Sequence, residues 1–236
     1  MIQLRPSDAR GQADHGWLQA KHSFSFADYY DPREMGWGAL RVINEDRVAP
    51  GTGFPMHGHR DMEIVTCILS GALEHKDSLG NGGIIRRGEV QRMSAGKGVL
   101  HSEFNPSADE ETHLLQIWIE PALKGGRASY DQHRLFTPDN ASQWVLVASP
   151  DGRDGSAVIQ QDALLLAAHL GPAEAVRHAL APGRLAYVHV IRGQVSLNGL
   201  ALAAGDGAKI ADESELAFQG GAEPGEFLLF DLPPAA

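Results

Sequence analysis

The sequence lacks the features of a disulfide-stabilised or membrane-spanning protein. It has one cysteine among 236 residues, so no disulfide can form within the chain. Cys67 lies in the apolar run of residues 64–69, which is typical of a buried and inert thiol. No apolar run is long enough to cross a bilayer, and residues 1–8 contain no apolar leader. We therefore expect a cytoplasmic protein with no membrane partner.

Positive charge is also scarce. Lysine and arginine total 20 against 30 acidic residues, which gives a net charge of −10. The densest basic cluster is only Arg86-Arg87. Without a basic field to attract phosphates, direct binding to nucleic acid or to an anionic membrane is not expected.

Helical periodicity is rare in the sequence. The 27 glycines and 13 prolines instead interrupt the chain at short intervals, as a many-stranded β protein requires. Segments with strand-like patterns occupy residues 23–26, 40–48, 61–69, 72–78, 84–90 and 112–120, and then 157–160, 163–170, 185–191, 194–197 and 226–232. These patterns predict an all-β fold.

Residues 121–143 are polar and rich in turn-forming residues, which suggests two domains. We place an N-terminal domain at 1–125, a linker at 126–145 and a C-terminal domain at 146–236. A weak internal repeat supports this division: an apolar strand, a glycine turn and a returning strand occur at 64–75 and again at 187–199. The second copy has no histidine pair beside it. The pattern fits a duplicated barrel with one working site.

Two pairs of potential metal ligands stand out, His57/His59 and His101/Glu103. Residues two apart in a strand point to the same face, so each pair can present two ligands together. If the two strands face each other across a small barrel, the four groups meet. Three imidazoles and one carboxylate, without a thiolate, suit a first-row divalent metal and not a structural zinc–cysteine site.

Glu63 competes with Glu103 for the fourth ligand position. Alternation along a strand cannot decide between them, because all five candidate positions (57, 59, 63, 101 and 103) have odd numbers. Distance favours Glu103, which is one pleat from His101, whereas Glu63 lies about 13 Å from His59 along a straight strand. A β-bulge could bring Glu63 back.

The remaining histidines have simpler interpretations. His113 either lines the barrel or is a hydrogen-bonded core residue, and we favour the second. His22 is expected to be structural. No ligand partner is visible in the sequence for His75, His133, His169, His178 and His189.

Longer motifs surround both ligand pairs. Gly51-x5-His57-x-His59-x3-Glu63-x7-Gly71 resembles the first cupin motif, with one extra residue in its last gap. Gly88-x5-Ser94-Ala-Gly96-x4-His101-x3-Asn105 resembles the second, with serine where many cupins have proline and a longer gap before the histidine. These departures, together with the segments 15–32 and 40–44, resemble the pirin family over residues 1 to about 120. The C-terminal segment, ending in Phe230-Asp-Leu-Pro, resembles the C-terminal cupin of the bacterial quercetinase branch.

This resemblance implies a bicupin, that is, two jelly-roll β-barrels in tandem with one metal in the first barrel. It implies His57, His59, His101 and Glu103 as the ligands. Fe(II) is the expected metal, and the same ligand set also accepts Ni, Co, Mn, Cu or Zn.

The implied activity is that of a quercetin 2,3-dioxygenase, which opens the flavonol ring with O2 and releases carbon monoxide. Glu103 would then act as the general base for a flavonol-like substrate, and we expect a monomer. Two alternatives remain open. One is a redox-sensing regulatory module that acts through protein partners, and the other is a metal that only stabilises the barrel.

Overall fold

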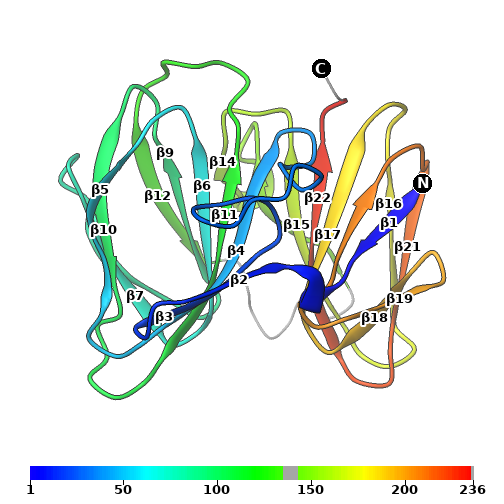
Figure 1. The fold of residues 1–236 in the computed structure, drawn as a ribbon. Helices are drawn as coiled ribbons and strands as arrows, with labels where there is room; N and C mark the ends of the chain where they lie inside the picture. Colours follow the sequence, from blue (N-terminus) through cyan, green and yellow to red (C-terminus); the bar gives the residue numbers. More distant parts are fainter. Residues whose placement is uncertain (135–142, 235–236) are drawn as a thin grey trace.

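The computed structural model describes residues 1–134 and 143–234, which are almost entirely β. Two barrels lie side by side, each built from a seven-stranded and a four-stranded sheet (Figure 1). This confirms the predicted all-β fold with two barrels in tandem. Within the described ranges no helix is long and apolar enough to cross a membrane.

The N-terminal barrel combines a seven-stranded sheet in the order β12-β9-β6-β11-β4-β3-β2 with a four-stranded sheet in the order β5-β10-β7-β8. Its strands are β2 (Gly11–Asp14), β3 (Leu18–His22), β4 (Leu40–Val48), β5 (Gly53–His59), β6 (Glu63–Ser70), β7 (Ala72–Asp77), β8 (Gly82–Arg86), β9 (Glu89–Ser94), β10 (Val99–Phe104), β11 (Thr112–Ile119) and β12 (Ser129–Arg134). All pairings between these strands are antiparallel.

The C-terminal barrel combines the orders β1-β20-β17-β22-β15-β13-β14 and β16-β21-β18-β19. Its strands are β1 (Ile2–Arg5), β13 (Val145–Ser149), β14 (Ala157–Val158), β15 (Leu164–Leu170), β16 (Ala175–Ala179), β17 (Leu185–Arg192), β18 (Gln194–Leu197), β19 (Leu200–Ala203), β20 (Gly207–Ile210), β21 (Glu215–Gly220) and β22 (Gly225–Leu232). Two short 3₁₀ helices, η1 (Ser7–Ala9) and η2 (Arg153–Gly155), complete the described elements.

The two seven-stranded sheets pack face to face through one shared hydrophobic core. On β6, Val65 and Cys67 belong to this core, whereas Ile64 and Ile68 pack inside the N-terminal barrel. The strand is therefore buried on both faces, which explains its continuous apolar run. It also confirms that Cys67 is buried, and burial raises the pKa of its thiol to about 12.

Two strands cross the domain limits expected from composition. Strand β1 pairs with β20 of the C-terminal barrel, although it belongs to the range 1–125, and Figure 1 shows it in blue among the strands of that barrel. Strand β12 lies inside the expected linker 126–145 but pairs with β9 of the N-terminal barrel. The part of the linker at 135–142 lies outside the described residues. Glycine and proline indicate where a chain turns, but they carry no information about which strand it joins.

One predicted strand, at residues 23–26, is wrong. Strand β3 ends at His22, and the chain then turns into a loop that Ser25 closes. The Ser25 hydroxyl donates to the Asp31 carbonyl and accepts from the Asp31 amide, both at 2.9 Å. Such local side-chain hydrogen bonds compete with a strand ladder.

Candidate metal centre

Three histidines converge between strands β5 and β10 of the N-terminal barrel. His57 and His101 stand opposite each other in the antiparallel register, and His59 is two residues further along β5. The Nε2 atoms of His57 and His101 are 3.0 Å apart. One ring nitrogen from each of the three lies within 4.8 Å of the others. The structure thus brings together the three imidazoles that the sequence singled out.

The protonation state of these rings suits metal binding. Burial is the main cause that lowers the pKa of His59 to about 4 and of His101 to about 3, and neighbouring imidazoles lower both further. Neutral imidazole is the form that binds a metal. The Nε2 of His59 is buried and has no hydrogen-bond partner within residues 1–134 and 143–234. His57 Nδ1 lies 2.8 Å from the Pro55 carbonyl, which directs its Nε2 to the cluster. This donor set fits a divalent metal.

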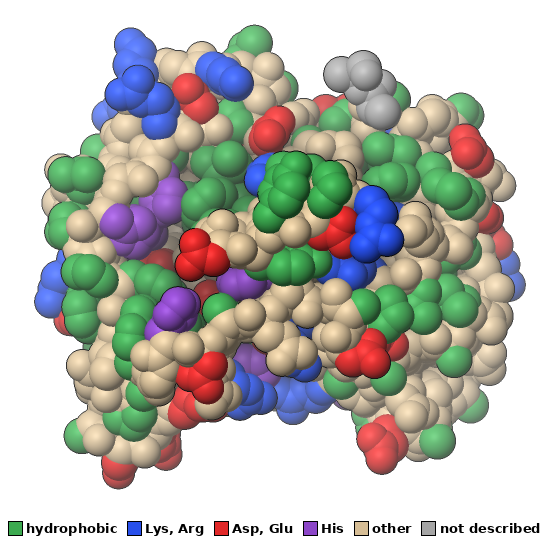
Figure 2. Space-filling model, in the orientation of Figure 1, with side chains coloured by type: hydrophobic (Ala, Val, Ile, Leu, Met, Phe, Trp, Pro, Cys, Tyr) green, Lys and Arg blue, Asp and Glu red, His purple; other side chains and the backbone are tan. Residues whose placement is uncertain are grey.

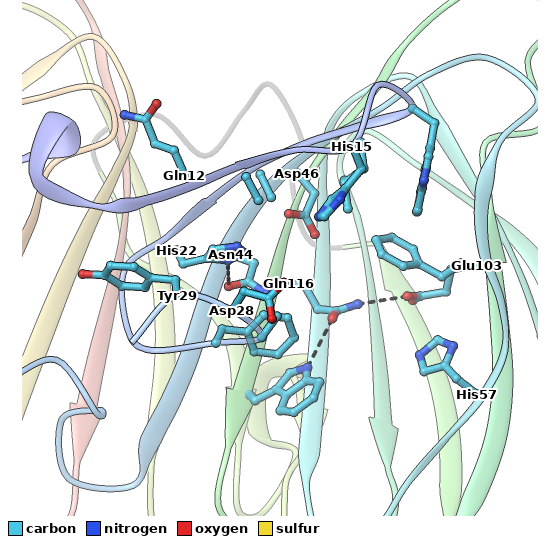
Figure 3. Close-up of a pocket in the computed structure, with 18 of the residues that line it drawn as sticks. Gln12, His15, His22, Asp28, Tyr29, Asn44, Asp46, His57, Glu103 and Gln116 are labelled. Atoms are coloured by element: carbon cyan, nitrogen blue, oxygen red, sulfur yellow. Dashed lines mark hydrogen bonds between the residues drawn. The ribbon is translucent and has the colours of Figure 1, made fainter. Parts of the chain in front are cut away.

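Glu103 lies at the base of the same barrel, where it is fully buried. Gln91 Nε2 donates to one carboxylate oxygen at 3.1 Å, and Gln116 Nε2 donates to the other at 2.9 Å. Burial raises the pKa of Glu103 to about 7, against the opposing effect of these two hydrogen bonds. Figure 3 shows the Gln116 amide linked to this carboxylate. The Trp118 indole donates in turn to the Gln116 Oε1 at 3.3 Å.

His75 is a member of the site that sequence reasoning missed. It lies opposite Glu103 in the register of β7 and β10, and it forms a second potential ligand group with His101 and Glu103 within 4.8 Å. Its Nε2 lies 3.2 Å from the Asp77 carboxylate, and its ring stacks on Tyr130 with centroids 4.5 Å apart. The available signal was the His75/Asp77 pair, which also has the spacing of two residues.

Glu63 has its partners elsewhere. Strand alternation puts it on the same face of β6 as Val65, toward the shared core, and the Ser94 hydroxyl donates to its carboxylate at 2.7 Å. Burial raises the pKa of Glu63, and the nearby Arg92 opposes that shift. Among the described residues, Glu63 belongs to neither potential ligand group.

Most of the other histidines have identifiable hydrogen-bond partners. His113 Nε2 lies 3.0 Å from Glu45, which agrees with the preferred interpretation of a hydrogen-bonded residue. His22 forms a hydrogen bond with Asn44 and His178 with Asp231. His133 Nε2 lies 3.0 Å from the Asp131 carboxylate, but without the geometry of a hydrogen bond. His189 differs, because both of its ring nitrogens are buried without a hydrogen-bond partner in the described part of the chain.

A cavity of about 720 Å³ connects the cluster to the surface. Apolar side chains, among them Trp17, Phe26, Phe54 and Trp118, form much of its wall. Figure 2 shows histidine side chains gathered around a hollow on this half of the molecule. A cavity with mainly apolar walls and a few polar groups is the usual form of a small-molecule site.

Comparisons with known proteins match the chain in two parts, which contain most strands of the N-terminal and of the C-terminal barrel respectively. Residues 3–119 match the family model described as Pirin. Residues 146–232 match the model described as Quercetinase C-terminal cupin domain.

Individual relatives extend along the whole chain. A protein named quercetin 2,3-dioxygenase from Escherichia coli K12 is 47% identical over 99% of this chain and 100% of its own length. A pirin-like protein from Caulobacter vibrioides is 46% identical over 98% of this chain and 99% of its own. The crystal structure of a bacterial pirin from E. coli in complex with nickel(II) superposes with a TM-score of 0.95 at 46% identity, covering both chains fully.

Proposed function

This chain belongs to the pirin family, and on that premise we propose that it is a metal-dependent dioxygenase that cleaves the flavonol ring of quercetin with O2. One observation carries the proposal. The imidazoles of His57, His59 and His101 converge beside a largely apolar cavity that His57 and His59 line. The buried carboxylate of Glu103 lines the same cavity and forms a second potential ligand group with His101 and His75.

The proposed ligands are His57, His59, His101 and Glu103, with Fe(II) as the proposed native metal. The nickel(II) complex of the E. coli relative supports a divalent metal in this family. A bound divalent metal would supply a Lewis acid for a substrate oxygen. Four protein ligands would leave positions open on a six-coordinate ion, which is typical of catalytic and not of structural sites.

The protein's own groups would bind and prepare the substrate. The aromatic rings of Phe54 and Trp118 would hold the flat flavonol and exclude water. Glu103 would accept the proton of the flavonol 3-hydroxyl, with Gln91 and Gln116 holding its carboxylate in place. Both atoms of O2 would enter the products, as two bonds of the central ring break and one ring carbon leaves as carbon monoxide.

The test is turnover with defined metals. Iron-loaded and nickel-loaded proteins are incubated with quercetin under O2, and loss of flavonol absorbance and release of carbon monoxide are followed. We expect turnover that a His57→Ala variant loses. A protein that holds metal stoichiometrically but turns over no quercetin with any metal would refute the dioxygenase and leave the metal site standing.

The other expectations belong to the same proposal. We propose a cytoplasmic monomer whose ligands are a flavonol-like substrate and O2, without direct binding to nucleic acid. Size-exclusion chromatography with light scattering tests the oligomeric state. A redox-dependent protein partner, captured only with the oxidised metal, would favour the regulatory alternative.

A further inference from the structure

Asp46 is a buried acid that the proposed function does not use. It lies on β4 and lines the cavity, as Figure 3 shows. Only 3% of its surface is exposed, and its Oδ1 is buried with no hydrogen-bond partner among the described residues. An unpaired buried carboxyl is costly, so its presence in a cavity wall calls for an explanation.

The strand register shows why Asp46 has no partner within the sheet. Its neighbours across the strands are Ala20 on β3 and Leu114 on β11, whose side chains cannot donate a hydrogen bond. Asn44, two residues earlier on the same face, differs because it pairs with His22 at 2.8 Å. The small side chain of Ala20 also leaves the carboxyl accessible from the cavity.

The nearest influential cation is already engaged. Burial and then the negative charge of Glu103 raise the pKa of Asp46 to about 7, and Arg10 opposes this shift. The Nη1 of Arg10 donates to Glu45 at 2.7 Å and its Nη2 donates to the Lys21 carbonyl at 3.0 Å. Asp46 and Glu45 are successive residues of a strand, so their side chains point to opposite faces. Asp46 lines the cavity while its Oδ1 is buried, so its second oxygen is the one that a ligand in the cavity can reach.

Asp46 and the metal cluster lie on opposite sheets of the barrel. Strand β4 belongs to the seven-stranded sheet, whereas His57 and Glu103 belong to the four-stranded sheet. The cavity between them has apolar walls that include Phe26 and Trp118. A ligand in the cavity would thus meet proposed metal ligands on one wall and an unpaired hydrogen-bond acceptor on the facing wall.

We propose that Asp46 binds a hydroxyl group of the substrate other than the one that meets the metal. This inference rests on the proposed function and adds a substrate preference to it. A phenolic hydroxyl donates well to a carboxylate, and a site that offers an unmet acceptor discriminates strongly against ligands without the donor. The site then selects polyhydroxylated flavonols over a flavonol that has only the 3-hydroxyl.

The test compares two ligands on three proteins. Dissociation constants for quercetin and 3-hydroxyflavone are measured by tryptophan quenching of the nickel-loaded protein in the absence of O2. In Asp46→Ala, affinity for quercetin should fall roughly tenfold or more, while affinity for 3-hydroxyflavone changes less than about twofold. Asp46→Asn, which keeps one acceptor oxygen, should be intermediate. An equal change for both ligands would overturn the inference.

Two controls separate binding from folding. Asp28 lines the same cavity but is exposed, so Asp28→Ala should leave the ratio of the two affinities unchanged. Because no hydrogen bond to Asp46 Oδ1 is present among the residues that the structure describes, Asp46→Asn should melt at the wild-type temperature or above it. A melting temperature lowered by more than about 5 °C would indicate a structural contact and overturn the inference.

Binding and turnover distinguish the two proposals. If the ratio of affinities changes as expected but quercetin is not cleaved, the role of Asp46 stands and the dioxygenase fails. If quercetin is cleaved but the ratio is the same in Asp46→Ala, the dioxygenase stands and the role of Asp46 fails. Failure of the wild-type protein to bind either flavonol overturns the role of Asp46 as well.

Discussion

Replacing Gln116 by leucine should weaken metal binding, although Gln116 is not a proposed ligand. Leucine has a similar volume but can neither donate to Glu103 nor accept from Trp118. The hydrogen bond to the carboxylate is 2.9 Å long and buried, and a bond of this kind contributes about 1.5–3 kcal/mol. The Trp118 contact, at 3.3 Å, adds about 0.5 kcal/mol at most.

The substitution also removes these hydrogen bonds from the metal-free protein. The free energy of metal binding should therefore change by less than the full hydrogen-bond contribution. Removing such outer partners from metal sites typically costs about 10–100-fold in affinity, which is about 1.4–2.8 kcal/mol. We expect a change in that range for Gln116→Leu. The assay is competition for nickel(II) against a chelator of known affinity, with the melting temperature of the metal-free protein measured beside it.

Gln12→Leu is the matched control, because Gln12 is an exposed residue on another wall of the cavity. It should bind metal as the wild type does. If Gln116→Leu melts normally and its metal affinity stays within about twofold of wild type, then Glu103 is not a ligand that Gln116 orients, and the reasoning is refuted.

Three further predictions follow from other contacts. Glu103→Gln should reduce bound metal in elemental analysis, whereas Glu63→Gln should keep it; the reverse would restore Glu63 as the ligand. Burial lowers the pKa of His189 from 6.5 to about 3, so this side chain is neutral in the folded protein. Below about pH 6.5 the unfolded chain binds a proton that the folded chain does not, and the free energy of unfolding therefore decreases as the pH falls. His189→Leu should lack this loss, of at most about 1.4 kcal/mol per pH unit, in urea unfolding at pH 7 and pH 5; an unchanged pH dependence would contradict it. Arg5→Leu removes the donors to the Tyr29 hydroxyl and the Ser23 carbonyl. It should lower the free energy of unfolding by about 2 kcal/mol in urea unfolding. A change near zero would show that β1 is held by its backbone hydrogen bonds alone.

The parts of the site that the sequence could predict were those with short-range patterns. A spacing of two residues indicates that both members of a pair lie on the same face of a strand, as in His57/His59 and His101/Glu103. The structure brings the three imidazoles together. Spacing could not decide whether Glu63 faces the ligands. That was settled only by the structure, in which the face of β6 that carries Val65 packs into the core shared by the two barrels.

The parts that could not be predicted depend on pairing between distant strands. Gln91 and Gln116 become partners of Glu103 only when β9, β10 and β11 close around the same interior. The position of β1 is a similar case. Its four residues pair with β20, some 200 residues away in the chain, and no local propensity encodes such a choice.

The core shared by the two seven-stranded sheets has a practical consequence for anyone who wishes to work with a shorter protein. Cutting the chain between the barrels would expose the outer face of Val65, Leu115 and Ile117 to water, and it would also remove β1 from its own sheet. Contiguous apolar surface of this kind favours aggregation. A fragment with every proposed ligand would therefore be expected to precipitate, because the C-terminal barrel covers the apolar face of the barrel that contains those residues.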